Sequence, residues 1–267
     1  MKLLLEKWRT FLNEQELPLM GAVVRYEKDF TIALALINLN FIKEQLENSE
    51  SVQDLAQKLN NKELYDKAVV GYIEATHAPL LSKVAMAKAN SGGNCAGTYT
   101  VGKAIGKGYG ELLYNALLGF AAKNSIFITA DRHSVSKGAR SRWSKIDSQT
   151  DEETPGNDNV YLGSFDNHKD KKTPPADDDC VVHGIDSLDK GYQDSKQVIY
   201  YNQLESNLEN FFKTEIRDMI TNPGFFGKLF GQTPERKARQ LQKQLLKLGR
   251  DKFRAWELEA LKDRTLR

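Results

Sequence analysis

The chain has 267 residues, 40% of them hydrophobic, and a formal net charge of +2 at pH 7. This length allows a substantial core, in one large domain or in one domain with appendages. The small net charge excludes a global field that would attract nucleic acid. No run approaches the roughly 20 apolar residues of a membrane span, and the N-terminus lacks a secretory cleavage pattern. Cys95 and Cys180 have no CxxC partner, so we expect no zinc knuckle, no disulfide framework and a reducing cytoplasm.

The N-terminal third alternates helical and strand patterns. Residues 1–14 place their apolar side chains on one helical face, which predicts an amphipathic helix. Apolar runs over 20–26 and 30–37 flank a polar trio and predict a β-hairpin. A helix is expected over 41–59, followed by a strand over 68–75.

The middle of the chain predicts a mixed α/β layer. Residues 81–89 fit a helix and a strand equally well. After them come a strand over 99–105, a helix over 111–123, a strand over 125–130 and a helix over 135–146. This alternation of strands and helices is typical of an α/β sheet with helices packed on it.

The C-terminal half begins with a polar segment and ends in helices. Residues 147–179 are dense in Asp, Gly, Asn and Pro and predict a loop, with a short strand expected at 160–165. Helices are expected over 198–220 and 234–261. The expected organisation is an N-terminal helix, a main domain, an acidic and proline-rich loop region and a helical extension, over residues 1–14, 20–165, 166–197 and 198–267.

Charge is distributed unevenly along this half. Asp and Glu dominate residues 147–190, and Lys and Arg dominate residues 235–267. Such blocks are most often solvated faces, although they also pair with each other or with partners. The basic C-terminal helix leaves a contact with nucleic acid open. It lacks the interleaved aromatic residues of a single-strand binder, and its leucine face favours packing on the protein itself.

A glycine-rich turn joins the strand over 99–105 to the helix over 111–123. Its sequence is Ile105-Gly106-Lys107-Gly108-Tyr109-Gly110-Glu111. Glycines leave backbone N–H groups unscreened by side chains, and here these groups lie at the positive end of the helix. The turn therefore predicts a seat for a phosphate or pyrophosphate group.

Two well-known phosphate loops fit this region less well. Residues 97–104 follow the GxxxxGK pattern of a P-loop, but Ala104 stands where Ser or Thr must hold the metal. A dinucleotide fold requires GxGxxG, whereas the glycines here are Gly106, Gly108 and Gly110. A nucleoside triphosphatase and a dinucleotide-binding enzyme are therefore disfavoured.

The segment 106–113 resembles the acyl-CoA loop of the GNAT N-acetyltransferase superfamily. The family motif runs Arg/Gln-x-x-Gly-x-Gly/Ala and leads into a helix with paired leucines. Gly108 and Gly110 match the two small positions, and Ile105 stands at the Arg/Gln position. The family continues with a strand and a helix that carries Asn-x-x-Ala-x-x-x-Tyr. The residues at matching spacing in this chain are Ser136, Ala139 and Trp143.

The resemblance implies a GNAT-like mixed sheet flanked by helices, and an acyltransferase that moves an acetyl or other acyl group from acyl-CoA to an amine. Main-chain amides of the loop bind the CoA pyrophosphate in this family. The residues it implies for acyl-CoA binding are Ile105, Gly106, Lys107, Gly108, Tyr109, Gly110, Ser136, Ala139 and Trp143.

The proton-transfer residues are less clear from the resemblance. Many members use the tyrosine of the second motif to protonate the leaving thiolate, and an indole at position 143 cannot do so. Ser134, Ser136 and Tyr109 are the nearby hydroxyls, and for both serines we favour the role of helix N-cap.

A general base is needed to deprotonate the acceptor amine. Glu74 lies on a predicted strand where the family's splayed central strands often carry a carboxylate, and Asp131 follows the strand after the loop. Each is also compatible with an ordinary surface acid. His133 ranks below both. Asp177, Asp178 and Asp179 predict a solvated loop tip, not a metal site, because consecutive side chains point in different directions.

Residues 1–14 resemble the short propeptides of tailed-phage head proteins, which a prohead protease removes after Leu/Ile-x-Glu. Leu12-Asn13-Glu14 matches, with cleavage expected before Gln15. A helix docked on the protein's own core is the competing interpretation. The resemblance implies a phage-encoded protein of the host cytoplasm or the virion, with head proteins as partners. Two alternative functions stay open: a virion protein that keeps the fold without turnover, and a nucleic-acid-modifying GNAT member.

Overall fold

The computed structural model describes residues 19–26, 31–50, 52–77, 98–106, 108–131, 135–149, 160–162, 186–189, 191–216 and 234–265. The predictions for residues 1–14, for residues 81–89, for both cysteines and for the three consecutive aspartates lie outside these residues.

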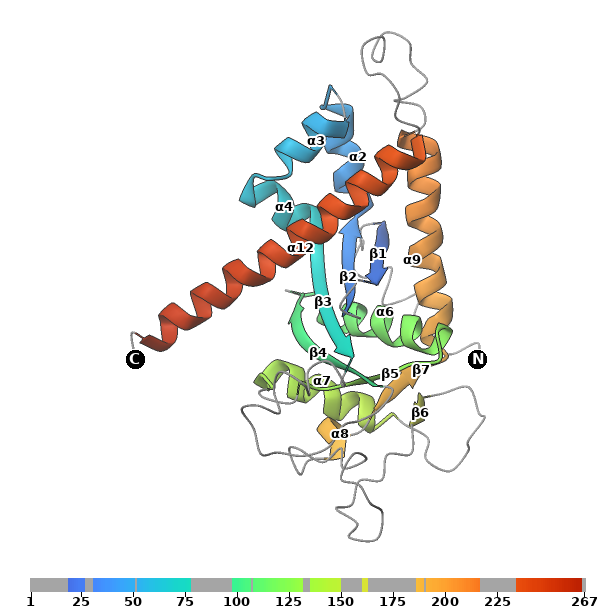
Figure 1. Cartoon of the computed structure of the whole chain (residues 1–267), viewed down its shortest axis with the longest axis vertical. Coiled ribbons are helices and arrows are strands. Elements are labelled where there is room, and N and C mark those ends of the chain that lie inside the picture. The colour runs from blue at the N-terminus through green and yellow to red at the C-terminus, as the bar shows by residue number, and fades with distance from the viewer. Residues whose placement is uncertain are drawn as a thin grey trace.

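A seven-stranded mixed sheet forms the centre of the protein, in the order β1-β2-β3-β4-β5-β7-β6 (Figure 1). Every neighbouring pair is antiparallel except β4 and β5, which are parallel. The mixed α/β character predicted from the sequence is therefore confirmed. The strands are β1 Met20–Tyr26, β2 Thr31–Asn38, β3 Val69–His77, β4 Thr98–Ile105, β5 Phe127–Thr129, β6 Val160–Leu162 and β7 Tyr192–Asp194.

The first two strands form the predicted hairpin, in register from Met20 opposite Asn38 to Tyr26 opposite Ile32. β2 is buried on both sides, because helices cover both faces of the sheet. This explains why its sequence is a continuous apolar run and does not alternate.

Three helices follow the hairpin where one was predicted over 41–59. α2 Leu39–Glu47 and α3 Val52–Lys58 share that range, separated by a polar break, and α4 Lys62–Ala68 was not predicted. Asparagine side chains begin two of them. Asn38 accepts a hydrogen bond from the Phe41 N–H at 3.1 Å, and Asn61 accepts one from the Glu63 N–H at 2.9 Å.

One face of the sheet is covered by α6 Gly110–Lys123 and by the first half of α9 Gln197–Phe211. α6 is apolar on nearly all sides and is buried from Leu112 to Ala121. α7 Lys137–Asp147 and the short α8 Asp186–Asp189 pack beside it. The helices predicted over 111–123 and 135–146 are thus confirmed, with small shifts at their ends.

The other face is covered by α2, α3, α4 and the long α12 Pro234–Thr265, which crosses the sheet diagonally (Figure 1). The leucine face of α12 packs on the sheet as predicted. Trp256 is the exception, because 39% of it is exposed. The helix predicted over 198–220 is α9 followed by a π-helical turn, η1 Phe212–Ile216. Among the described residues, no helix combines the length and the apolarity that crossing a membrane requires.

Candidate functional site

The predicted phosphate seat is a tight turn between β4 and α6. The Tyr109 N–H donates to the Gly106 carbonyl at 2.9 Å and closes the turn. Gly108 has a φ of +80°, a left-handed conformation that side chains disfavour. A Cβ at Gly106 would lie 3.2 Å from the Gly110 nitrogen. The geometry of the turn therefore favours glycine at positions 106 and 108.

The first turn of α6 begins at this site without a side-chain cap from its N-cap residue. Tyr109 occupies the N-cap position and makes no side-chain capping hydrogen bond. N–H groups of a first helical turn have no partner within the helix, and they form the positive end of its dipole. Such an end favours an anion. The structure thus has the donor arrangement that the sequence predicts, while anion binding itself stays a prediction.

Helix α7 is anchored to the same turn of α6 by a charged cluster. Glu111 accepts hydrogen bonds from Arg142 at 3.0 Å and from Lys145 at 2.9 Å, and Arg142 also donates to Asn115. Burial alone would raise the pKa of Glu111, but the two cations outweigh it and hold that pKa below its usual range. The negative charge of Glu111 is therefore largely neutralised beside the seat.

The parallel strands β4 and β5 pair over only three residues. Their last pair is Thr100 opposite Thr129, whose hydroxyls lie 3.1 Å apart, and β5 ends there while β4 continues to Ile105. β4 also has a β-bulge at Gly102, because Ala75 pairs with Val101 and Glu74 with Lys103. Bulges are frequent beside functional sites, where they redirect a side chain or end the pairing of two strands. Between Thr100 and the glycine turn, the backbone of β4 has thus parted from β5.

The other residues of the predicted loop have mixed roles. Ile105 is buried in the core on the α12 face, so only its backbone faces the turn. Tyr109 is half-buried and packs on the core of the α6 face. Lys107 lies outside the described residues.

The second predicted motif forms the start of α7. Ser136 is its N-cap, and its hydroxyl accepts from the Ala139 N–H at 3.3 Å, which confirms the capping role. Trp143 is a core residue with 1% of its surface exposed, stacked on Tyr192 at 5.5 Å and edge-on to Tyr114 at 5.4 Å. The indole therefore offers no surface to a cofactor. The match at position 143 has a structural explanation, because Trp143 lies on the face of α7 that packs on the core.

Glu74 lies on the α12 face of β3 in a buried charged cluster. Its carboxylate accepts from Lys103 on β4 at 2.6 Å, from Arg250 on α12 at 2.8 Å and from the Tyr72 hydroxyl. Burial alone would raise the pKa of Glu74, but these hydrogen bonds outweigh it and leave the pKa lowered. A carboxylate held in this state is a weaker base than a free one, which argues against Glu74 as the general base.

Asp131 lies two residues after the end of β5 and is partly buried near Tyr114. Burial raises the pKa of the Tyr114 hydroxyl, and the charge of Asp131 adds to that shift. Ser134 and His133 lie outside the described residues. Of the two predicted bases, Asp131 is the one at the carboxyl end of β5, on the side where β4 and β5 part.

Sequence reasoning missed the residues that pair with Glu74 and the hydroxyl pair of Thr100 and Thr129. Lys103 was detectable in principle, because it lies opposite Glu74 on the neighbouring strand. Arg250 was not, because it is 176 positions away along the chain. Within the described residues, no three His, Cys, Asp or Glu side chains form a group that could hold a metal ion. No protein-family model, curated protein or solved structure matches this chain.

Proposed function

We propose that this protein is a GNAT-type acyl-CoA-dependent N-acyltransferase. The single observation that carries the proposal is the junction of β4 and α6: a glycine turn that leads into a helix without a side-chain cap at Tyr109, next to a strand that has parted from its parallel neighbour. The resemblance of segment 106–113 to the family's acyl-CoA loop gives this junction its proposed ligand.

The loop amides bind the pyrophosphate of CoA. Gly108 carries no side chain to cover them, and a Cβ at that position would meet no atom within 4 Å, so the space in front of the turn is open. The positive end of α6 favours the diphosphate. Because Glu111 is paired with two cations, it repels this ligand less than a free carboxylate would.

The acyl group lies along β4 beyond the last pair with β5. There a backbone amide that β5 no longer engages polarises the thioester carbonyl. The acceptor ammonium loses one proton to a general base, and the neutral amine attacks that carbon. The C–N bond forms, the C–S bond breaks, and the CoA thiolate takes up the second proton, which the nitrogen releases. Asp131 is the proposed base, because the charged cluster around Glu74 weakens that carboxylate as a proton acceptor.

Titration calorimetry with acetyl-CoA tests the proposal. Wild type should bind, and Gly108→Glu should bind at least tenfold more weakly than Gly108→Gln. Both variants share the size of the side chain and its strain at positive φ, about 1 kcal/mol, so their difference isolates the added charge at the seat. Wild type without heat of binding, or two variants with equal affinity, would reject acyl-CoA as the ligand.

A second candidate function is acyl-CoA binding without turnover, in a protein such as a phage virion component. Buried Trp143 at the family's tyrosine position and the ion-paired Glu74 favour it. Thiol release from acetyl-CoA in the presence of a primary amine separates the two. Release that is lost in Asp131→Asn supports transfer, whereas binding without release supports the second candidate.

A further inference from the structure

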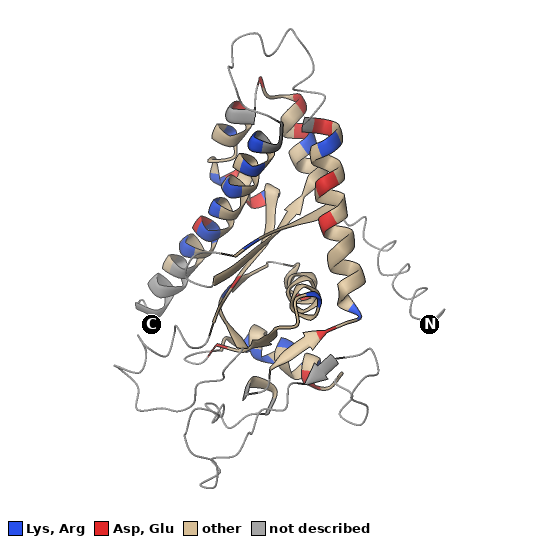
Figure 2. Ribbon diagram, turned by 45° about the vertical axis from the view of Figure 1, so that its right-hand side comes forward, with Lys and Arg blue, Asp and Glu red and all other residues tan. Residues whose placement is uncertain are grey.

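Helix α12 carries a continuous basic face on the side away from the sheet. From Arg236 to Arg254 the sequence contains eight basic residues and a single acidic one, Asp251. Figure 2 shows the resulting blue bands along the part of this helix that is drawn in colour. The exposed members of this face, which we call the basic stripe, are Arg236, Arg239, Lys243, Lys247 and Arg254.

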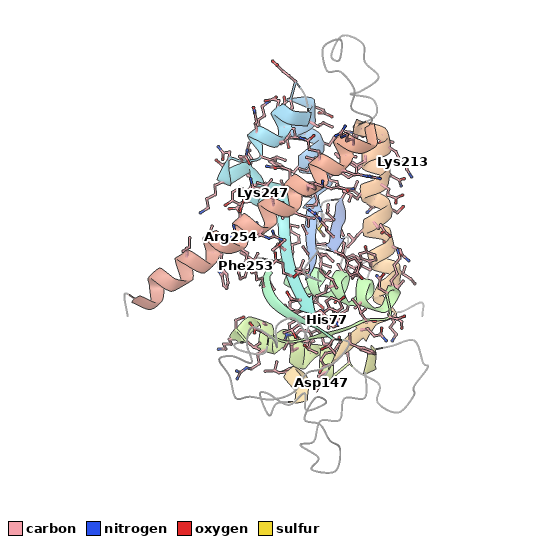
Figure 3. The ribbon with its side chains drawn as sticks, viewed as in Figure 1. His77, Asp147, Lys213, Lys247, Phe253 and Arg254 are labelled. Carbon is pink, nitrogen blue, oxygen red and sulfur yellow. The ribbon has the colours of Figure 1, made fainter. Side chains whose placement is uncertain are left out.

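The basic stripe is straight and regular. Its members are spaced by three, four, four and seven residues, and at 3.6 residues per turn these spacings keep them on one side of the helix. The stripe spans about 27 Å at 1.5 Å per residue. Figure 3 labels two of its members, Lys247 and Arg254.

The members of the stripe differ in how far the described residues neutralise their charge. Arg254 lies 3.9 Å from Asp251, and the Arg254 side chain is 65% exposed. No carboxylate whose side chain the structure describes pairs with Arg239, Lys243 or Lys247. By contrast, Arg250 and Lys252 turn inward, onto Glu74 and onto the Val69 carbonyl. The stripe is therefore separate from the cations that hold α12 on the sheet.

The surroundings of the stripe select among anionic partners. Between Arg236 and Arg254 the apolar face of α12 is buried against the sheet, and the exposed apolar residues Trp256 and Leu258 lie beyond the stripe, so the stripe itself offers no apolar side to a lipid surface. No aromatic residue lies among the stripe members, and exposed Trp256 lies beyond Arg254, so the stripe itself offers bases no stacking surface. A rigid row of point charges without a stacking platform suits a regular row of phosphates.

We propose that the basic stripe of α12 binds the phosphate backbone of duplex DNA without sequence preference. This function goes beyond the proposed acyl transfer and does not rest on it. A protein that binds DNA through its phosphates needs positive charges in a row along the backbone and no contact with the bases. The exposed side of α12 carries such a row.

Fluorescence anisotropy with a labelled random-sequence duplex and the full-length chain tests this inference. Five phosphate contacts predict a slope of about −4.5 in a plot of log K against log salt. The variant Arg239→Gln/Lys243→Gln/Lys247→Gln should bind about tenfold or more weakly at 50 mM salt and reduce the slope to about −2. Absence of binding by wild type, or a slope near zero, would overturn the proposal.

A matched control removes the same number of charges elsewhere. Lys67→Gln/Lys196→Gln/Lys213→Gln changes three exposed lysines outside α12, of which Lys213 is labelled in Figure 3. This variant should bind the duplex within twofold of wild type. If it weakens binding as much as the stripe variant, net charge and not the stripe is responsible, and the proposal fails. Tighter binding to single strands or to anionic vesicles than to the duplex would also overturn it.

Discussion

The two faces of the sheet are held in different ways. On the α6 face the contacts are almost entirely apolar, and Leu113 and Leu117 of α6 are buried against Leu34 and Ile73 of the sheet. On the α12 face a leucine stripe is combined with buried charge. The polar contacts there join the cluster around Glu74 to α12 and bring the Lys252 ammonium 2.8 Å from the Val69 carbonyl.

This difference suits the two faces to different proposed functions, the α6 face to holding the glycine turn rigid and the α12 face to presenting the basic stripe. Apolar burial is insensitive to pH and salt, so it fixes α6 and the glycine turn at its start as a rigid seat. Charge-assisted hydrogen bonds are directional and hold α12 in one orientation, with its basic stripe outward. The two faces should therefore respond differently to mutation and to pH.

Trp143→Ala should give the largest effect, because it removes the most voluminous fully buried side chain of the α6 face. We expect a loss of about 3–5 kcal/mol in the free energy of unfolding, measured by urea denaturation. Trp143→Phe should lose much less. If Trp143→Ala kept its stability but lost acetyl-CoA binding, the indole would line the ligand site and not the core.

Glu74→Gln tests the polar α12 face and should cost about 1–3 kcal/mol, because it removes the charge-assisted hydrogen bonds to Lys103 and Arg250, whose side chains are 39% and 30% exposed. Glu205→Gln is the matched control. Its partner is Lys123 at 2.7 Å, and both side chains are about 40% exposed, at 42% and 39%. It should cost less than about 1 kcal/mol. Equal losses for the two variants would contradict the buried cluster as a stabilising contact.

Gly249→Ala tests how closely α12 approaches the sheet. A Cβ at this position would lie 2.5 Å from the ring of Tyr72, which is fully buried and cannot move aside. We expect a loss of about 1–3 kcal/mol. Gly138→Ala, at a helical position where the Cβ meets nothing, should gain about 0.5–1 kcal/mol. Thermal denaturation of the pair distinguishes the approach of α12 from the effect of any added methyl group.

The effect of pH on stability should also differ between variants on the two faces of the sheet. The folded state holds the pKa of Glu74 below its ordinary value of 4.5, so the stabilisation that the ionised Glu74 provides is complete above that pH. This stabilisation is lost as the pH falls through the lowered folded-state pKa. The stability difference between wild type and Glu74→Gln should therefore shrink below pH 4.5. The difference for Trp143→Phe should stay constant, and parallel pH profiles for both variants would refute this assignment.

Ser136→Ala should give the smallest effect, a loss of about 1 kcal/mol from the missing cap of α7. Ser141→Ala, at an exposed position within the same helix, should be neutral or slightly stabilising. Acetyl-CoA affinity, measured by calorimetry, should be unchanged in both. A large loss of affinity in Ser136→Ala alone would give this hydroxyl a direct role at the ligand.

Local patterns in the sequence predicted most of the regular elements. The hairpin of β1 and β2, the strands β3 to β6, and the helices α6, α7, α9 and α12 follow from apolar periodicity and turn residues. α4, α8 and β7 were missed. β7 has only three residues and no pattern of its own, and tertiary contacts define it: Tyr192 stacks on Trp143 and donates to Asp147 at 2.9 Å.

The glycine turn follows from the local sequence, because a positive φ at Gly108 and the tight approach at Gly106 are local conditions that appear directly as residue types. The roles of Trp143 and Glu74, by contrast, depend on tertiary contacts. The first became a core residue and the second an ion-paired carboxylate because their environments are built from distant segments, such as Arg250 for Glu74. Burial and charge pairing depend on which elements meet, and local sequence patterns do not encode that.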